Sequence, residues 1–160
     1  MLKNLFLSSL ITIFLVQPVL AFGTYKKLNF NDDKSDPHAS KILYEYVLKS
    51  QNMSPVEIKN LVGIKPKSAK AFEVDLNEDG IKEIIGLVYS TFYWVSAGYS
   101  LFILQKQSNG YKDISTLVFE LQEIVEIRSR KTNGYHDIKL TDSNGNSVQY
   151  VAKYKDGMYQ

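Results

Sequence analysis

The chain has 160 residues, of which 44% are hydrophobic and 22% charged, and its formal net charge is +2 at pH 7. This length suits one domain with a real core, and the near balance of charge argues against nucleic acid or a strongly anionic surface as a partner. The chain contains no cysteine, which excludes a disulfide, a thiol nucleophile and a lipid-anchored cysteine.

Residues 1–21 have the features of a cleavable signal peptide. Lys3 gives a positive start, an apolar run follows over residues 5–16, and Ala21 lies where a signal peptidase would cut. The apolar run is too short to span a bilayer comfortably. We therefore expect export to the periplasm, or beyond it to the medium, with no membrane contact after cleavage. An uncleaved N-terminal anchor is the alternative.

The first elements after the cleavage site are an arm and a helix. Residues 22–35 are polar with scattered aromatic side chains, which predicts an extended and mobile arm. Asp36 followed by Pro37 is typical of a helix start. Apolar residues at helical spacing then predict a helix over residues 37–49.

A second helix is expected directly afterwards. Ser54 and Glu57 have the spacing of a capping box, and Gly63 is typical of a helix end. The segment that follows contains three lysines, which suit either a solvated linker or a patch for an anionic ligand: Lys65, Lys67 and Lys70.

From Ala69 onward the pattern changes to the alternation and turn dipeptides of β-strands. The expected strands cover residues 71–76, 84–93, 99–105, 111–118, 121–129, 135–140, 148–154 and 158–159. The predicted fold class is therefore α+β, with two N-terminal helices packed on a meandering antiparallel sheet of about six to eight strands. Residues 36–160 would form this single domain.

One turn between two expected strands has chemistry of its own, because it reads D-x-N-x-D-G-x-x-E. Calcium binds six to eight oxygen ligands, and alternate side chains of a tight loop can point several oxygens at one centre. Gly80 permits the sharp bend that such a loop needs. Calcium is the expected cofactor, and the expected ligands are Asp75, Asn77, Asp79, the backbone carbonyl of Ile81, and Glu83.

A turn without metal is the alternative, because Asp79-Gly80 between two apolar runs is also a hairpin signal. An EF-hand is excluded, since its bidentate acid belongs at the twelfth position and that position is Gly86. Residues 142–146 also alternate oxygen-bearing side chains. They lack a closing acid and predict an ordinary turn.

The loop residues just named resemble the calcium loops of FG-GAP and integrin-propeller-like repeats, in which an Asp/Asn-rich loop joins two strands. The likeness covers one motif, whereas a propeller has about four or more blades. With the later run TNGYHDI at 132–138, the chain is also similar to short exported bacterial proteins, some of which resemble periplasmic immunity proteins against secreted wall-degrading toxins. Such relatives often have a cysteine pair where this chain reads YWVSAG at 93–98. The resemblance implies a periplasmic location, and it does not imply a particular reaction.

The groups that catalysis needs are sparse. His136 and Asp137 are consecutive on an expected strand, so their side chains should point to opposite faces. Glu120 and Glu123 could be a carboxylate pair for glycoside cleavage, but nothing else in the sequence supports that role and a solvated edge is the preferred explanation. The usual serine, metalloprotease and phosphate-binding motifs are missing from the sequence. We expect no enzyme, and a hydrolase with an unrecognised site is the alternative.

An aromatic segment offers a surface for a partner. Consecutive aromatic residues on a strand expose at least one ring unless both faces are covered, and exposed Trp and Tyr often anchor protein interfaces. We expect a non-catalytic immunity or inhibitor protein whose partner is a secreted toxin or hydrolase, with the calcium loop stiffening the hairpin that presents this segment. The same rings suit a calcium-dependent cell-wall or glycan-binding module, or burial beneath the helices. The expected partner-binding residues are Phe92, Tyr93, Trp94 and Tyr99.

Overall fold

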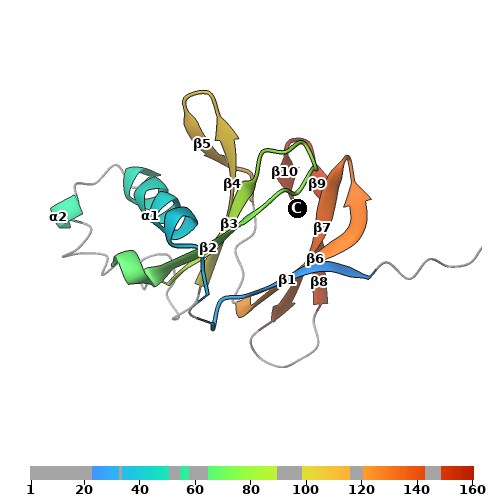
Figure 1. Cartoon of the computed structure of the whole chain (residues 1–160), viewed down its shortest axis with the longest axis horizontal. Coiled ribbons are helices and arrows are strands. Elements are labelled where there is room, and N and C mark those ends of the chain that lie inside the picture. Colours follow the sequence, from blue (N-terminus) through green and yellow to red (C-terminus); the bar gives the residue numbers. More distant parts are fainter. Residues whose placement is uncertain are drawn as a thin grey trace, which may run out of the picture.

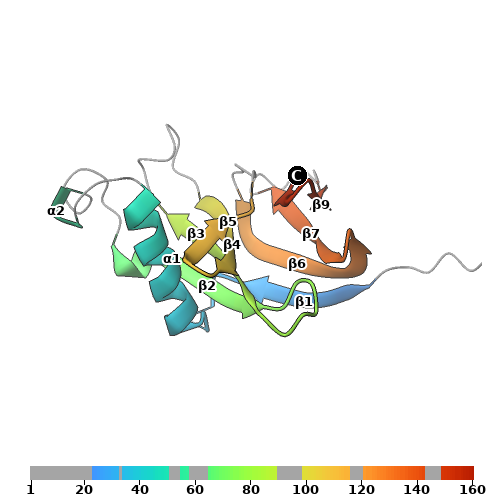
Figure 2. The ribbon, with the colours of Figure 1, turned by 90° about the horizontal axis from the view of Figure 1, so that it is seen from above.

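The computed structural model describes residues 23–32, 34–50, 55–57, 65–89, 99–115, 121–142 and 149–160. Within these ranges the molecule has three layers, which are one helix and two four-stranded β-sheets (Figures 1 and 2). None of the helices in the described ranges reaches the length and hydropathy that a membrane crossing requires.

The inner sheet is the middle layer, between the helix and the second sheet. In spatial order its antiparallel strands are β2 (Ala69–Val74), β3 (Glu83–Tyr89), β4 (Tyr99–Gln107) and β5 (Gly110–Asp113). Six consecutive residues of β3, from Glu83 to Val88, are buried. Neighbouring side chains point to opposite faces of a strand, so β3 must be covered on both sides.

The outer sheet covers one face of the inner sheet. In spatial order its antiparallel strands are β1 (Thr24–Asn29), β6 (Leu121–Thr132), β7 (Tyr135–Asp142) and β8 (Gln149–Ala152). Val125, Ile127 and Ile138 share one buried core with Ile85 and Ile103 of the inner sheet. A small hairpin follows β8 and consists of β9 (Tyr154–Lys155) and β10 (Met158–Tyr159).

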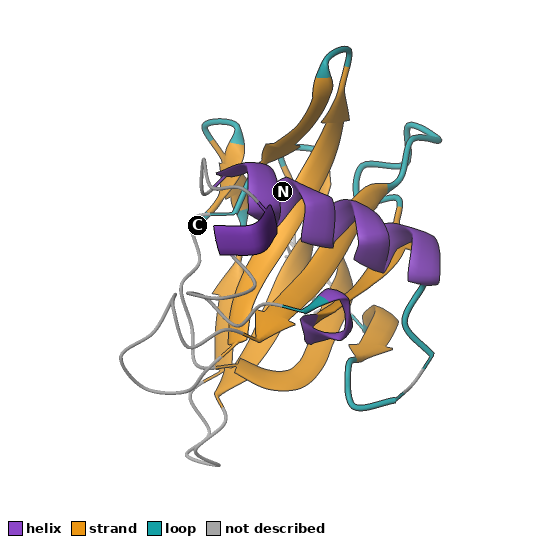
Figure 3. Cartoon of the chain, turned by 90° about the vertical axis from the view of Figure 1, so that its left-hand side faces the viewer, coloured by secondary structure: helices purple, strands orange, loops and turns teal. Residues whose placement is uncertain are grey.

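Helix α1 (Pro37–Ser50) lies across the opposite face of the inner sheet (Figure 3). Its first turn is capped by Asp36, whose Oδ1 accepts hydrogen bonds from the backbone N–H of His38 at 2.8 Å and of Ala39 at 3.1 Å. The apolar stripe of the helix is buried in a second core with residues of the inner sheet, and its fully buried members are Ala39, Leu43 and Val47.

Gly86 of β3 allows this close approach, so we expect Gly86→Ala to destabilise the fold. A methyl group there would lie 2.3 Å from Cδ2 of Leu43 and 2.9 Å from the carbonyl oxygen of Lys70. Overpacking of this kind costs about 1–3 kcal/mol of unfolding free energy, measurable by urea denaturation. Gly23→Ala is the matched control, because a methyl group there meets open space. Equal stability of the two variants would contradict the close packing.

The predicted fold class, α+β with two N-terminal helices packed on one meandering sheet, is wrong. In the part of the chain that the structure describes, the strands form three separate antiparallel sheets, and this part is mostly β. Where the second helix was expected, the structure has a three-residue helix, α2 (Pro55–Glu57), and residues 58–62 lie outside the described ranges. A short 3₁₀ helix, η2 (Pro66–Ser68), then leads into β2. The doubly buried β3 needs a layer on each face, which a single sheet under helices does not supply.

Part of the segment expected to be an arm belongs to the sandwich. Strand β1 pairs with β6 in the outer sheet, with Leu28 opposite Val125. Leu28 and Phe30 are each only 1% exposed and lie in the core between the sheets. The sequence signal for a buried face was the spacing of Leu28 and Phe30, two positions apart. The polar residues around them made this signal weak.

Candidate functional site

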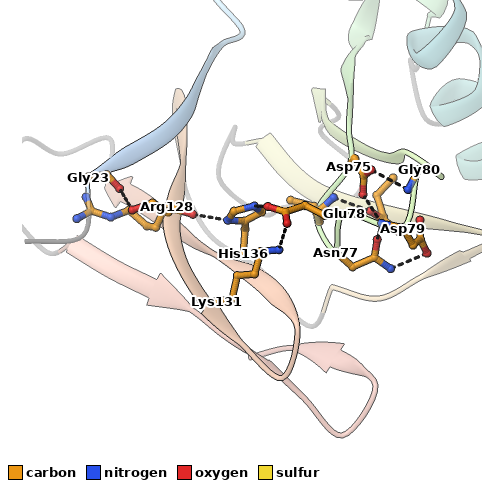
Figure 4. Close-up of polar contacts among 12 residues, drawn as sticks. Gly23, Asp75, Asn77, Glu78, Asp79, Gly80, Arg128, Lys131 and His136 are labelled. Atoms are coloured by element: carbon orange, nitrogen blue, oxygen red, sulfur yellow. Dashed lines mark hydrogen bonds and ion pairs between the residues drawn. The ribbon is translucent and has the colours of Figure 1, made fainter. Parts of the chain in front are cut away.

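The loop with the expected calcium ligands joins β2 to β3 (Figure 4). Two of its residues have left-handed backbone conformations, Glu78 with φ of 62° and Gly80 with φ of 85°. Glycine adopts this conformation without steric cost, as predicted for Gly80, but glutamate rarely adopts it. The loop must therefore contain contacts that stabilise Glu78 in this unusual geometry.

The alternating polar side chains point their oxygens at the loop's own backbone. Asp75 accepts from the N–H of Asp79 at 3.2 Å through Oδ1 and from that of Gly80 at 2.9 Å through Oδ2. Asn77 Oδ1 also accepts from Asp79 N–H, at 3.1 Å. Asp79 Oδ1 accepts from the N–H of Ile81 at 2.7 Å. Three expected ligands thus hold the loop in a tight turn by accepting hydrogen bonds from its backbone N–H groups.

Glu83 differs from these residues because it lies inside the protein. Its side chain is 1% exposed, and Oε2 accepts a hydrogen bond from the N–H of Leu76 at 2.9 Å, which closes the base of the loop. The pKa of Glu83 is raised to about 7, chiefly by burial and to a smaller extent by the nearby carboxylates of Asp79 and Asp75, against the opposing hydrogen bond from Leu76. The carboxylates of Asp75 and Asp79 thus act electrostatically on the buried Glu83.

The donor set fits calcium in type. Within the described ranges, no cluster of three or more His, Cys, Asp or Glu side chains already has the arrangement of a metal site. The oxygens of Asp75, Asn77 and Asp79 are engaged by N–H groups, yet each carboxylate oxygen has a second lone pair that can bind a cation. The side chain of Ile81 is 53% exposed, so a metal could use this residue only through its backbone. Calcium binding at this loop stays a prediction.

Glu78 was not singled out from the sequence, and it connects the loop to the outer sheet. Its Oε2 lies 2.7 Å from Nζ of Lys131, and its Oε1 lies 3.0 Å from Nε2 of His136 (Figure 4). The hydrogen bonds from Lys131 and then from His136 lower the pKa of Glu78. Only the fold brings these residues together, since 53 or more positions separate Glu78 from both partners in the chain.

A tyrosine cluster beneath the loop gives a second connection. Nδ2 of Asn77 donates to the hydroxyl of Tyr135 at 3.2 Å, and Gln105 Nε2 donates to the same hydroxyl at 2.6 Å. The ring of Tyr135 stacks on that of Tyr154 with centroids 3.9 Å apart. Tyr159 is fully buried beside them, and its hydroxyl donates to the carbonyl of His136 at 2.8 Å. Loop and sheets therefore form one packed unit.

Of the four expected partner-binding residues, the described ranges include one, Tyr99. Phe92, Tyr93 and Trp94 are outside the described ranges, and only the backbone of Tyr99 is described, where it pairs with Tyr89 at the far end of β3. Since β3 has seven residues, roughly 20 Å separates that end from the calcium loop. Whether the loop stiffens the segment at residues 92–98 stays a prediction, because that segment lies outside the described ranges.

We expect the stability of the protein to depend on pH through Glu83. The folded state keeps this carboxyl protonated up to about pH 7, whereas the unfolded chain releases the proton near 4.5. The contribution of Glu83 to stability is therefore greatest below about pH 4.5 and falls as pH rises, by about 2 kcal/mol between pH 5 and 7. Urea unfolding in chelator tests this, with Glu83→Gln expected to flatten the profile. An unchanged slope in that variant would contradict the assignment.

Comparisons with models of known protein families, with curated proteins and with solved structures found no match. The likeness of the loop to FG-GAP repeats and of the chain to periplasmic immunity proteins accordingly stays a prediction. Any conclusion about function depends on the geometry of this loop and of the surfaces around it.

Proposed function

We propose that the protein is an exported, non-catalytic binding protein that is stabilised by one calcium ion in the Asp75–Glu83 loop and that recognises another protein. One observation carries the calcium part of this proposal. The side-chain oxygens of Asp75, Asn77 and Asp79 all turn toward the inside of one tight loop, with Glu83 at its base. Oxygen ligands at this density suit a hard divalent cation.

The state of His136 supports a binding role over a catalytic one. Its side chain is only 3% exposed, and its ring nitrogens face Glu78 Oε1 at 3.0 Å and the carbonyl of Arg128 at 2.7 Å. A general base must reach the substrate's proton within hydrogen-bonding distance. A buried ring with both nitrogens occupied supports the fold instead.

The far end of the inner sheet supports recognition of a protein with acidic residues. Tyr89 is 43% exposed there, directly before the segment that carries the expected aromatic anchors. A depression of about 250 Å³ adjoins it, and its lining includes two lysines: Phe30, Lys67, Ser68, Lys70, Leu87 and Tyr89. Aromatic and basic side chains together suit a partner that presents carboxylates.

Direct binding to a panel of secreted wall-degrading hydrolases, measured by interferometry, tests the proposal. We expect one member to bind, and Tyr89→Ala together with Lys67→Glu to weaken binding about tenfold or more. Lys112→Glu on the exposed β5 is the matched charge control. A panel without any binder would overturn the proposal. Binding to wall polysaccharide that disappears in chelator would replace it with the glycan-binding alternative.

The partner surface and the calcium loop lie at opposite ends of β3, so we expect them to be separable. Asp79→Asn should leave affinity for the protein partner within about threefold of the wild-type value at 25 °C, provided that the fold is intact. Binding measured with calcium and with chelator gives the comparison. A large loss of partner binding in Asp79→Asn would place the interface at the loop instead.

A further inference from the structure

We infer that Glu78 makes the loop a latch for strand β1: it fixes His136 of β7, and His136 supports Tyr25 of β1, so that loss of the latch releases the edge of the outer sheet. Figure 4 shows the contact between Glu78 and His136. The stacking of Tyr25 on His136 extends this contact to β1. The latch is independent of metal as a structural device. Its control by calcium rests on the proposed function.

The first step is the fixed position of Glu78. Its left-handed backbone is unfavourable for a glutamate and persists only where surrounding contacts determine it. The residues on both sides, Asn77 and Asp79, use their side chains to bond the loop backbone. The Glu78 carboxylate then reaches out of the loop to Lys131 and His136.

The second step is the attachment of His136 at three points. Its backbone N–H donates to the carbonyl of Leu76 at 2.8 Å, beside the loop. Its Nδ1 lies 2.7 Å from the carbonyl oxygen of Arg128 on β6, and its Nε2 lies 3.0 Å from Glu78. The ring plane is thereby determined from both ends, and Glu78 supplies the one contact that comes from a side chain of the loop.

The third step is the contact of this ring with β1. Tyr25 stacks on His136 with ring centroids 4.3 Å apart and an interplanar angle of 10°. The pairing of β1 with β6 shifts register between Thr24 and Lys26, so the backbone of Tyr25 falls at an irregularity of the ladder. Side-chain stacking therefore contributes much of what holds this residue to the sheet.

Calcium enters through the neighbours of Glu78. An ion bound by Asn77 and Asp79 would restrict the backbone on both sides of Glu78 and so keep its carboxylate directed at His136. Calcium should then protect β1, although β1 contributes no ligand. In this coupling the element with two states is strand β1, which is either held against the outer sheet or released from it.

Hydrogen exchange of the backbone amides of residues 24–29 in the full chain tests the latch. In chelator, we expect Glu78→Ala, which removes the bond to His136, to exchange about tenfold faster there than the wild type, with little change in β3. Lys82→Ala is the matched control, because Lys82 is also a charged loop residue but pairs with Glu73 of the inner sheet at 3.4 Å. Tyr25→Ala, which leaves the loop untouched, should show the same acceleration.

Each outcome separates the latch from the calcium site. If Glu78→Ala and Tyr25→Ala exchange at residues 24–29 like the wild type, the latch is wrong whether or not calcium binds. If calorimetry detects no calcium binding while both variants release β1, the latch stands and the proposed calcium function fails. With both correct, calcium slows exchange of these amides in the wild type but not in Glu78→Ala, even where that variant is saturated with calcium.

Discussion

Calcium at 10 mM is expected to raise the unfolding free energy of the protein by about 1.4–2.7 kcal/mol, since a site of this exposed kind should have a dissociation constant of about 0.1–1 mM. The ion binds the folded loop, where the oxygens of Asp75, Asn77 and Asp79 already face inward, and the unfolded chain offers no such arrangement. Urea denaturation with calcium and with chelator measures the gain, and calorimetry measures the affinity.

The informative variant is Asp79→Asn. Its amide oxygen can still accept the hydrogen bond from Ile81 N–H, but its amide nitrogen cannot accept the one that Asn77 Nδ2 donates to Asp79 Oδ2 at 2.8 Å. The fold in chelator should therefore lose only about 1 kcal/mol, the typical contribution of one hydrogen bond. Loss of one negative charge should weaken calcium binding by about tenfold or more and remove most of the stabilisation. Asp156→Asn, at the exposed β9–β10 turn, controls for net charge. An equal calcium response in wild type and Asp79→Asn would exclude this loop as the site.

Local signals in the sequence placed many strands correctly. Asn133-Gly134 marks the β6–β7 turn, where both residues have positive φ, and the apolar run Ile84–Val88 forms the central β3. Such features depend on neighbours within a few residues, so they can be predicted from a single sequence. The same holds for the bend at Gly80.

The pairing of strands that are distant in the sequence could not be predicted in this way. Strand β1 pairs with β6, and Thr24 lies opposite Arg128, about a hundred residues later. A polar segment with two buried residues gives no sign of which strand it joins. The division of the strands into separate sheets was also missed. Alternation of apolar residues shows that a strand has a buried face, but it does not show which element covers that face.

The candidate site was predicted in part. The pattern of Asp75, Asn77 and Asp79 gave the residues whose oxygens turn into the loop. It gave no indication that Glu83 is buried or that Glu78 leaves the loop to contact β6 and β7. Those properties come from packing of the two sheets against each other, which the spacing of polar residues does not encode.

Phe30→Ala is expected to have the largest effect on the fold, a loss of about 3–5 kcal/mol in unfolding free energy. Its side chain is 1% exposed and meets Phe72 edge to face with ring centroids 5.0 Å apart, so the substitution leaves a cavity between the sheets. Most small domains have only about 5–15 kcal/mol of stability, so this variant should unfold at far lower urea concentration. Circular dichroism during urea titration measures the midpoint.

Lys27→Ala gives the matched control for Phe30→Ala, because Lys27 lies nearby on β1 with an exposed side chain. Its stability should stay within about 0.5 kcal/mol of the wild-type value. If residues 22–35 were a mobile arm, both substitutions would be equally harmless. A large difference between them would instead show that this segment contributes to the core, with β1 as one strand of the outer sheet.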